Sequence, residues 1–235
     1  LFLAANGNYF IGTFDGKSFA KESGPFRGDY GANSYATQSY SDIPKSDGRR
    51  IQITWMNGGK YPEMPFNQQM SFPCEMTLRT LPEGLRLCRW PVREIESLYE
   101  KDASVNERAL ASGESAAADI KGDTLDIEAE FEVTGDAEFG LKVRGEEIRY
   151  STKEATVTCL SKVAPLKPVD KRVRLRALVD RTSLEVYGNN GAISMTSCVL
   201  PKLSEQSVEA FSQSGVVKLV SLRVHSLRSA WPKAK

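Results

Sequence analysis

Two segments in the second half of the chain alternate apolar and charged residues with a period of two. In residues 125–133 every odd position is apolar and every even position is Asp or Glu. In residues 172–179 Arg172, Arg174 and Arg176 alternate with apolar residues. Successive side chains of a strand point to opposite faces, so both segments are predicted to be strands with one buried face.

The charges on the outer faces of these two strands allow two arrangements. If the strands are neighbours in one sheet, acidic and basic side chains lie opposite each other, and each pair contributes roughly 0.2–1 kcal/mol. Otherwise both charged faces meet solvent and never each other. We expect the second arrangement.

Further short strands are predicted along the whole chain, and no segment shows a helical period. Between residues 91 and 99 the pattern changes to that of a linker or short helix. We place a domain boundary there, with residues 1–95 as the first domain and 96–235 as the second. Many short strands with polar turns predict an all-β protein with a β-sandwich in its second domain. The first domain suits propeller blades as well as a sandwich. The predicted strands are 8–14, 34–40, 50–56, 69–72, 75–80, 85–90, 125–133, 172–179, 183–187, 192–198, 207–211 and 216–227.

Composition argues against several classes of partner. The 235 residues carry a net charge of +1, which does not favour nucleic acid or an anionic membrane as the main partner. No apolar run approaches the ~18–20 residues that span a bilayer. The four cysteines are far apart in the sequence and there is one histidine, so we expect free cysteines, no zinc site and no cofactor. The chain shows no signal-peptide pattern and begins without methionine, and we expect it to be a fragment.

The stretch from Gly28 to Met56 holds the candidate binding residues. Asp29 precedes one predicted strand, and Trp55 lies near the end of the next. If both reach the same end of a small sheet, the carboxylate would accept hydrogen bonds from sugar hydroxyls and the indole would cover an apolar sugar face. Alternatively, Asp29 is a turn aspartate and Trp55 a buried tryptophan, and these residues alone favour this second interpretation.

An ordered set of motifs runs along nearly the whole chain. The motifs are Asn-Tyr-Phe-Ile-Gly-Thr-Phe-Asp-Gly at 8–16, Asp-Tyr-Gly at 29–31, Tyr-Ala at 35–36, Ser-Asp-Ile-Pro at 41–44, Thr-Trp-Met-Asn at 54–57, Met-Ser-Phe-Pro at 70–73 and Val-Asp-Arg-Thr-Ser-Leu-Glu-Val-Tyr-Gly-Asn at 179–189. The set resembles glycoside hydrolase family 32, the levanases, inulinases and invertases. Each motif is moderately specific, but their order makes the resemblance strong.

The resemblance implies a five-bladed β-propeller followed by a β-sandwich, with this chain holding part of blade 4, blade 5 and the sandwich. It also implies retaining hydrolysis of terminal β-fructosyl linkages in levan, inulin or sucrose. Such hydrolysis needs a nucleophile and a general acid/base about 5–5.5 Å apart. As in many family members, secretion or a periplasmic location is then expected.

The catalytic tripeptides of the family are absent from this sequence. The nucleophile sits in Asn-Asp-Pro, the transition-state stabiliser in Arg-Asp-Pro and the acid/base in Glu-Cys-Pro, and none of these occurs here. We interpret Glu75, in Cys74-Glu75, as structural. The chain alone is therefore expected to be inactive and to need the other half of the propeller, from a longer parent chain or a bound fragment.

The resemblance assigns a few residues to substrate binding. Asp29 is expected to hydrogen-bond a fructosyl unit, Trp55 to form an apolar wall, and Tyr35 to lie in the same layer. The family's second tryptophan, in Met-Asn-Asn-Trp, is replaced by Gly59. In the sandwich signature Asp180, Arg181 and Glu185 are interpreted as forming strand-end salt bridges.

A second hypothesis treats the sandwich as a lectin-like carbohydrate module with a propeller remnant. It predicts aromatic side chains on one exposed face, with Tyr150 and Trp231 side by side in a groove. The candidates are Phe131, Phe139, Tyr150, Tyr187, Phe211 and Trp231, most of which alternate with charged residues as core residues do.

Overall fold

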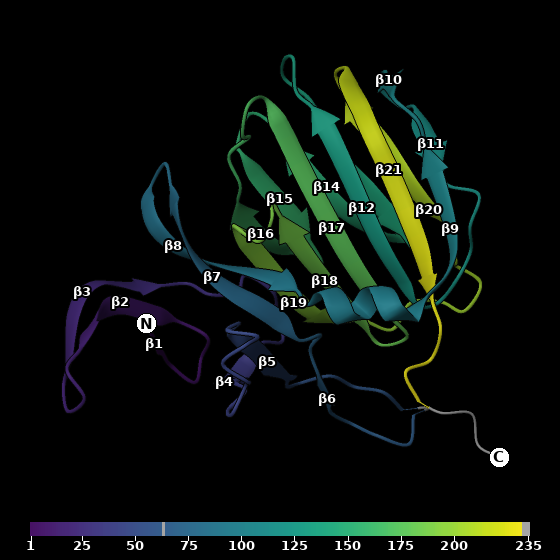
Figure 1. Ribbon diagram of the computed structural model, residues 1–235. Coiled ribbons are helices and arrows are strands. Elements are labelled where there is room, and N and C mark those ends of the chain that lie inside the picture. Colours follow the sequence, from purple (N-terminus) through teal and green to yellow (C-terminus); the bar gives the residue numbers. More distant parts are fainter. Residues whose placement is uncertain (63, 232–235) are drawn as a thin grey trace.

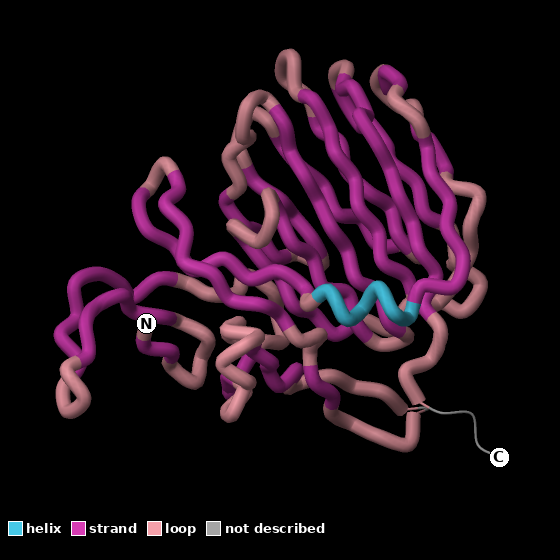
Figure 2. The backbone as a smooth tube through the Cα atoms, viewed as in Figure 1, coloured by secondary structure: helices cyan, strands magenta, loops and turns pink. Residues whose placement is uncertain are grey.

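A computed structural model describes residues 1–62 and 64–231, and within them the strands form four antiparallel sheets (Figures 1 and 2). Two small sheets belong to the N-terminal part. The first contains β1 (Phe2–Leu3), β2 (Tyr9–Phe14) and β3 (Phe19–Phe26). The second contains β4 (Tyr35–Ser39), β5 (Ile51–Met56), β6 (Gln69–Met70), β7 (Cys74–Leu81) and β8 (Gly84–Pro91).

The two larger sheets face each other and form a sandwich. One contains β9 (Tyr99–Val105), β10 (Arg108–Leu110), β12 (Leu125–Glu132), β17 (Arg172–Asp180), β18 (Ser183–Gly188), β19 (Ile193–Cys198) and β21 (Val217–Leu227). The other contains β11 (Ser115–Ala117), β13 (Glu138–Val143), β14 (Glu146–Ser151), β15 (Thr156–Cys159), β16 (Lys162–Pro165) and β20 (Val208–Ser214). The segment expected to be a linker or short helix forms the 3-10 helix η1 (Arg93–Leu98).

The core of the sandwich is built from the apolar positions of the alternating strands. Phe131, Phe139 and Tyr150 are fully buried, and their rings lie 4.7 and 5.2 Å apart in sequence order. The odd positions of β12 are buried throughout, as the period-two pattern predicts. The four cysteines are free, and three of them are buried.

The acidic face of β12 and the basic face of β17 lie side by side, so our expectation that they never meet was wrong. The strands are antiparallel neighbours in a register that places Glu128 opposite Arg176 and Glu130 opposite Arg174. Arg172 and Arg174 both contact the Glu130 carboxylate, at 2.7 and 3.4 Å. Burial tends to raise the pKa of Glu130, but the two arginines hold that pKa below its ordinary value.

Replacing Glu130 with glutamine is expected to lower the free energy of unfolding by about 1 kcal/mol, because two arginines lose a shared, partly exposed anion. The loss should shrink in 1 M salt, which screens exposed charges. Urea unfolding at low and high salt measures it. The exposed Glu22 on β3, changed to glutamine, is the matched control. If Glu130→Gln and Glu22→Gln had equal effects, the ion pairs of Glu130 would contribute nothing to the free energy of unfolding.

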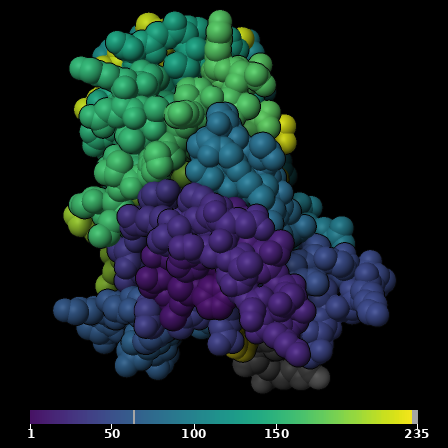
Figure 3. Space-filling model, turned by 90° about the vertical axis from the view of Figure 1, so that its left-hand side faces the viewer, coloured from purple at the N-terminus to yellow at the C-terminus, as the bar shows by residue number. Residues whose placement is uncertain are grey.

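The N-terminal sheets lie against one end of the sandwich (Figure 3). The segment 29–33 runs beside β19, at the edge of the seven-stranded sheet. The Tyr30 N–H donates to the Ser194 carbonyl at 2.8 Å, and the Asn33 N–H donates to the Thr196 carbonyl at 3.0 Å. A Cβ on Gly31 would lie 2.1 Å from the Thr196 carbonyl oxygen, so only glycine permits this approach. The segment thereby covers an edge that would otherwise present unpaired backbone groups.

Candidate functional site

Asp29 lies at the contact between the N-terminal sheets and the sandwich. Its carboxylate is buried and forms an ion pair with Arg89 of β8. It also accepts hydrogen bonds from the Gly31 N–H at 2.8 Å, the Thr196 N–H at 3.0 Å and the Thr196 hydroxyl at 2.8 Å. Four donors from three segments thus hold this carboxylate. Its predicted contact with a fructosyl unit stays a prediction.

Arg89 extends the same polar cluster. It is buried, and its guanidinium donates to the Gln52 side-chain oxygen at 3.0 Å and to the Ser194 hydroxyl. Gln52 and Thr54 are the polar side of β5, and both are buried. The polar face of β5 is therefore directed toward protein rather than solvent.

Glu185, in the middle of β18, is the second buried carboxylate of this contact. It accepts hydrogen bonds from the Phe72 N–H at 2.8 Å and from the Tyr187 hydroxyl at 2.9 Å. The Tyr187 hydroxyl also lies 3.3 Å from the Cys74 sulfur. Burial raises the pKa of Glu185 to about 7, an effect that outweighs these hydrogen bonds and nearby Arg89.

Asp180, Arg181 and Glu185 were expected to form strand-end salt bridges, and among the described residues Arg181 alone does so. It forms an exposed ion pair with Asp123 at 2.8 Å. The Asp180 carboxylate accepts the Arg181 N–H at 2.7 Å. For Glu185 the expectation was wrong, because within residues 1–62 and 64–231 this carboxylate has hydrogen-bond donors but no ion-pair partner.

Tyr35 and Trp55 form an aromatic pair on the N-terminal sheet. They are directly opposed on β4 and β5, and their ring centroids lie 6.1 Å apart in an edge-to-face arrangement. Tyr35 is 42% exposed, and the Trp55 indole N–H donates to the Gln68 side chain at 2.6 Å. Tyr35 is thus the exposed ring of the pair and Trp55 the partly buried one, and their predicted contact with a sugar stays a prediction.

Of the three predicted binding residues, the structure brings Tyr35 and Trp55 together. Among the described residues, neither a hydrogen bond nor a ring contact joins Asp29 to Tyr35 or Trp55. A Cβ on Gly59 would lie 2.3 Å from the Tyr61 hydroxyl oxygen, so Tyr61 takes part of the space beside Gly59.

Aromatic residues of the sandwich do not form the exposed face that the lectin-like hypothesis requires. Phe131, Phe139 and Tyr150 are fully buried, Tyr187 is 1% exposed, and Phe211 is partly buried. Tyr150 has no exposed surface, whereas Trp231 is 84% exposed, so they do not share a groove. Phe131 occupies an odd position of β12, where the period-two pattern predicts a core residue.

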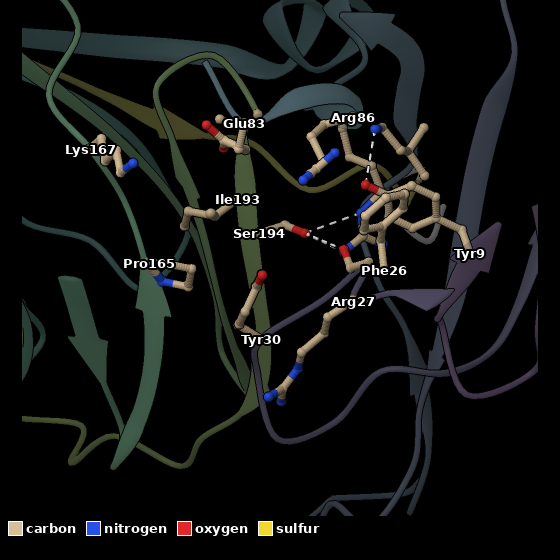
Figure 4. A pocket seen from close by; sticks show the side chains of 15 residues that line it. Tyr9, Phe26, Arg27, Tyr30, Glu83, Arg86, Pro165, Lys167, Ile193 and Ser194 are labelled. Carbon is tan, nitrogen blue, oxygen red and sulfur yellow. Dashed lines mark hydrogen bonds between the residues drawn. The ribbon is translucent and has the colours of Figure 1, made fainter. Parts of the chain in front are cut away.

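A cavity of about 350 Å³ lies between the N-terminal sheets and the sandwich (Figure 4). Its walls come from both parts: Phe26 and Tyr30 from one side, and Ile193 and Lys167 from the other. Sequence reasoning missed it, as it missed Arg89 and Thr196. Their partners are 60 and 167 residues away in sequence, so a local motif gives no signal for these contacts.

Two family models cover most of the chain in order. The N-terminal domain model of glycosyl hydrolases family 32 matches residues 4–91, and the C-terminal model matches residues 94–226. The chain belongs to glycoside hydrolase family 32. The domain boundary at residue 95 stays a prediction, although the two matches meet nearby.

Individual members of family 32 agree with this assignment. The levanase of Bacillus subtilis (strain 168) is 34% identical over 95% of this chain, and the match covers 38% of that protein. The extracellular exo-inulinase of Aspergillus niger is 26% identical over 95% of the chain and 48% of its own length. The exo-inulinase structure from Aspergillus awamori superposes with a TM-score of 0.81 at 22% identity, covering 95% of this chain and 50% of that one.

These comparisons confirm the predicted fold: an all-β chain with the last part of a β-propeller followed by a sandwich. The chain spans at most about half the length of these three family 32 proteins. Within the described residues, no helix is long and apolar enough to cross a membrane.

Proposed function

We propose that this chain is the C-terminal portion of a retaining β-fructosidase that acts on terminal fructosyl linkages in levan, inulin or sucrose. The observation that carries the proposal is the ordered match of both family 32 models, supported by the 34% identity to a levanase. A secreted or periplasmic location is part of the proposal, and it is supported by the Aspergillus niger exo-inulinase, which is named extracellular.

The catalytic carboxylates of such an enzyme would come from the other part of the propeller. The sequence lacks the Asn-Asp-Pro, Arg-Asp-Pro and Glu-Cys-Pro tripeptides. Asp29 and Glu185 are poor substitutes for these carboxylates, because both are buried and already hydrogen-bonded, whereas a nucleophile must reach the sugar.

Exposed apolar side chains on and beside the N-terminal sheets fit a contact with further propeller blades. Phe2 is 52% exposed, Phe14 is 65% exposed and Tyr40 is 45% exposed. In a propeller, the neighbouring blades would cover such side chains and the free edges of these sheets. We propose that the rest of the propeller occupies this face, whether it comes from the same parent chain or from an associated fragment.

Tyr35 and Trp55 would then form an apolar wall for the fructosyl unit. The test uses a joined protein, with the preceding propeller portion of the Bacillus subtilis levanase fused ahead of residue 1. Trp55→Ala in this protein is expected to raise KM for fructose release from levan by roughly tenfold or more, because a sugar loses its aromatic partner.

Trp231→Ala is the matched control, since this tryptophan is exposed and lies outside the aromatic pair. It is expected to leave KM within twofold of the unmodified protein. Equal effects of the two substitutions would exclude Trp55 from the site. A joined, folded protein that releases no fructose from levan, inulin or sucrose would overturn the proposed function itself.

A further inference from the structure

The cavity between the N-terminal sheets and the sandwich gathers positive charge. Arg27 and Arg86 come from the N-terminal sheets and Lys167 comes from the sandwich, while Glu83 is the acidic residue of the lining. Throughout the described part of the chain, none of the three cations lies within ion-pair distance of a carboxylate. Arg89 also lines the cavity, but its charge is paired with that of Asp29. The other three cations and Glu83 therefore leave a surplus of two positive charges.

Two of these cations are held in place by their neighbours. The Arg86 guanidinium lies 4.2 Å from the centre of the Phe26 ring, and its Nη1 donates to the Leu85 carbonyl at 2.8 Å. The Arg27 guanidinium lies 4.9 Å from the centre of the Tyr30 ring, and its Nε donates to the Asp29 carbonyl at 2.8 Å. Each guanidinium keeps further N–H groups, because arginine has five.

The hydroxyl of Tyr30 points into the same cavity, whose lining also includes Glu83, Arg86 and Lys167 (Figure 4). It has no hydrogen-bond partner among the described residues. Burial raises the pKa of this tyrosine, while Arg27 and Arg86 lower it and Glu83 raises it, so all three charges act on the hydroxyl. It therefore remains a neutral donor for a ligand at neutral pH.

We propose that this cavity binds a small organic phosphate, with Arg86, Lys167 and the Tyr30 hydroxyl on the phosphate group. A phosphate monoester carries about −1.5 to −2 charges at neutral pH, which matches the surplus in the lining. Arginine and lysine are the usual cations for this group. Phe26, Pro165 and Ile193 provide apolar walls for the carbon skeleton, and the volume is within the range of small-molecule sites.

Such a ligand would join the two parts of the molecule, since Arg86 lies on β8 and Lys167 follows β16. A ligand that binds only the folded protein raises the melting temperature of that protein by mass action. The assignment rests on the cavity alone and does not depend on the proposed fructosidase activity.

Titration calorimetry of the 235-residue chain at low salt tests the site with fructose 6-phosphate, inorganic phosphate and fructose. Fructose 6-phosphate is expected to bind, with fructose at least tenfold weaker. Tighter binding of the ester than of inorganic phosphate supports a contribution from the apolar walls. Equal binding of the two would overturn the assignment of an organic phosphate and leave a site for free phosphate. Failure of both phosphates to bind the folded chain would overturn the proposal.

Lys167→Gln is expected to weaken fructose 6-phosphate binding by roughly tenfold, because a charged hydrogen-bond donor is lost. Lys202→Gln removes the same charge from an exposed residue outside the cavity, and its affinity should stay within twofold. Circular dichroism verifies that both variants fold. Equal affinities of these two variants would also overturn the proposal.

Discussion

Replacing Arg89 with methionine is expected to lower the free energy of unfolding by about 3–5 kcal/mol. The substitution keeps most of the side-chain volume but leaves the Asp29 carboxylate buried without its cation, and losing one partner of a buried pair has a cost of this size. Both side chains are buried, at 7% and 3% exposure, so water cannot replace the lost charge. Urea unfolding followed by circular dichroism measures the change.

Arg181→Met is the matched control, because Arg181 forms an ion pair with Asp123 that is exposed. Its effect should stay below about 1 kcal/mol, as for most surface pairs. The double variant Asp29→Asn with Arg89→Met should recover part of the loss, since it has no orphan charge. If Arg89→Met and Arg181→Met were equally stable, the buried ion pair of Asp29 and Arg89 would contribute no more than the exposed one.

Replacing Glu185 with glutamine is expected to change how stability depends on pH. The pKa of Glu185 is raised from 4.5 in the unfolded chain to about 7 in the folded protein. Below pH 4.5 the carboxyl is protonated in both states, and folding loses nothing. Between pH 4.5 and about 7 the unfolded chain ionises first, so stability falls by about 3 kcal/mol through this group.

The glutamine variant lacks this ionisation, and its amide can donate to the Tyr187 hydroxyl while its oxygen accepts the Phe72 N–H. Relative to the unmodified chain, Glu185→Gln should therefore gain about 3 kcal/mol as pH rises from 4.5 to 7.5. Glu154→Gln, an exposed change, should give no such gain. Parallel pH profiles for Glu185→Gln and the unmodified chain would show that Glu185 titrates normally.

The strands of the sandwich were predictable because burial imposes a period on the sequence. Strand β12 follows this rule: its apolar residues face the core, and the residues between them carry charge. The pairing of β12 with β17 was not predictable, because register depends on a strand 40 or more residues away. The ordered motifs indicated the family, which local periodicity alone would have left open.

The buried cluster could not be predicted for the same physical reason. Asp29 has the sequence context of a turn residue, and its carboxylate is satisfied by Thr196, which lies in the other part of the molecule. Gln52 and Thr54 are polar residues that alternate with apolar ones on β5, yet both are buried. Tyr35 and Trp55 were predictable as neighbours because one hairpin brings them together.

Fructose release from levan, inulin and sucrose should be measured for the 235-residue chain and for the joined protein. We expect no release by the chain alone, because the family's three catalytic tripeptides are absent from it. We expect release by the joined protein, in which the preceding portion of a family 32 levanase completes the propeller. Clear fructose release by the folded 235-residue chain alone would show that its own residues suffice for catalysis.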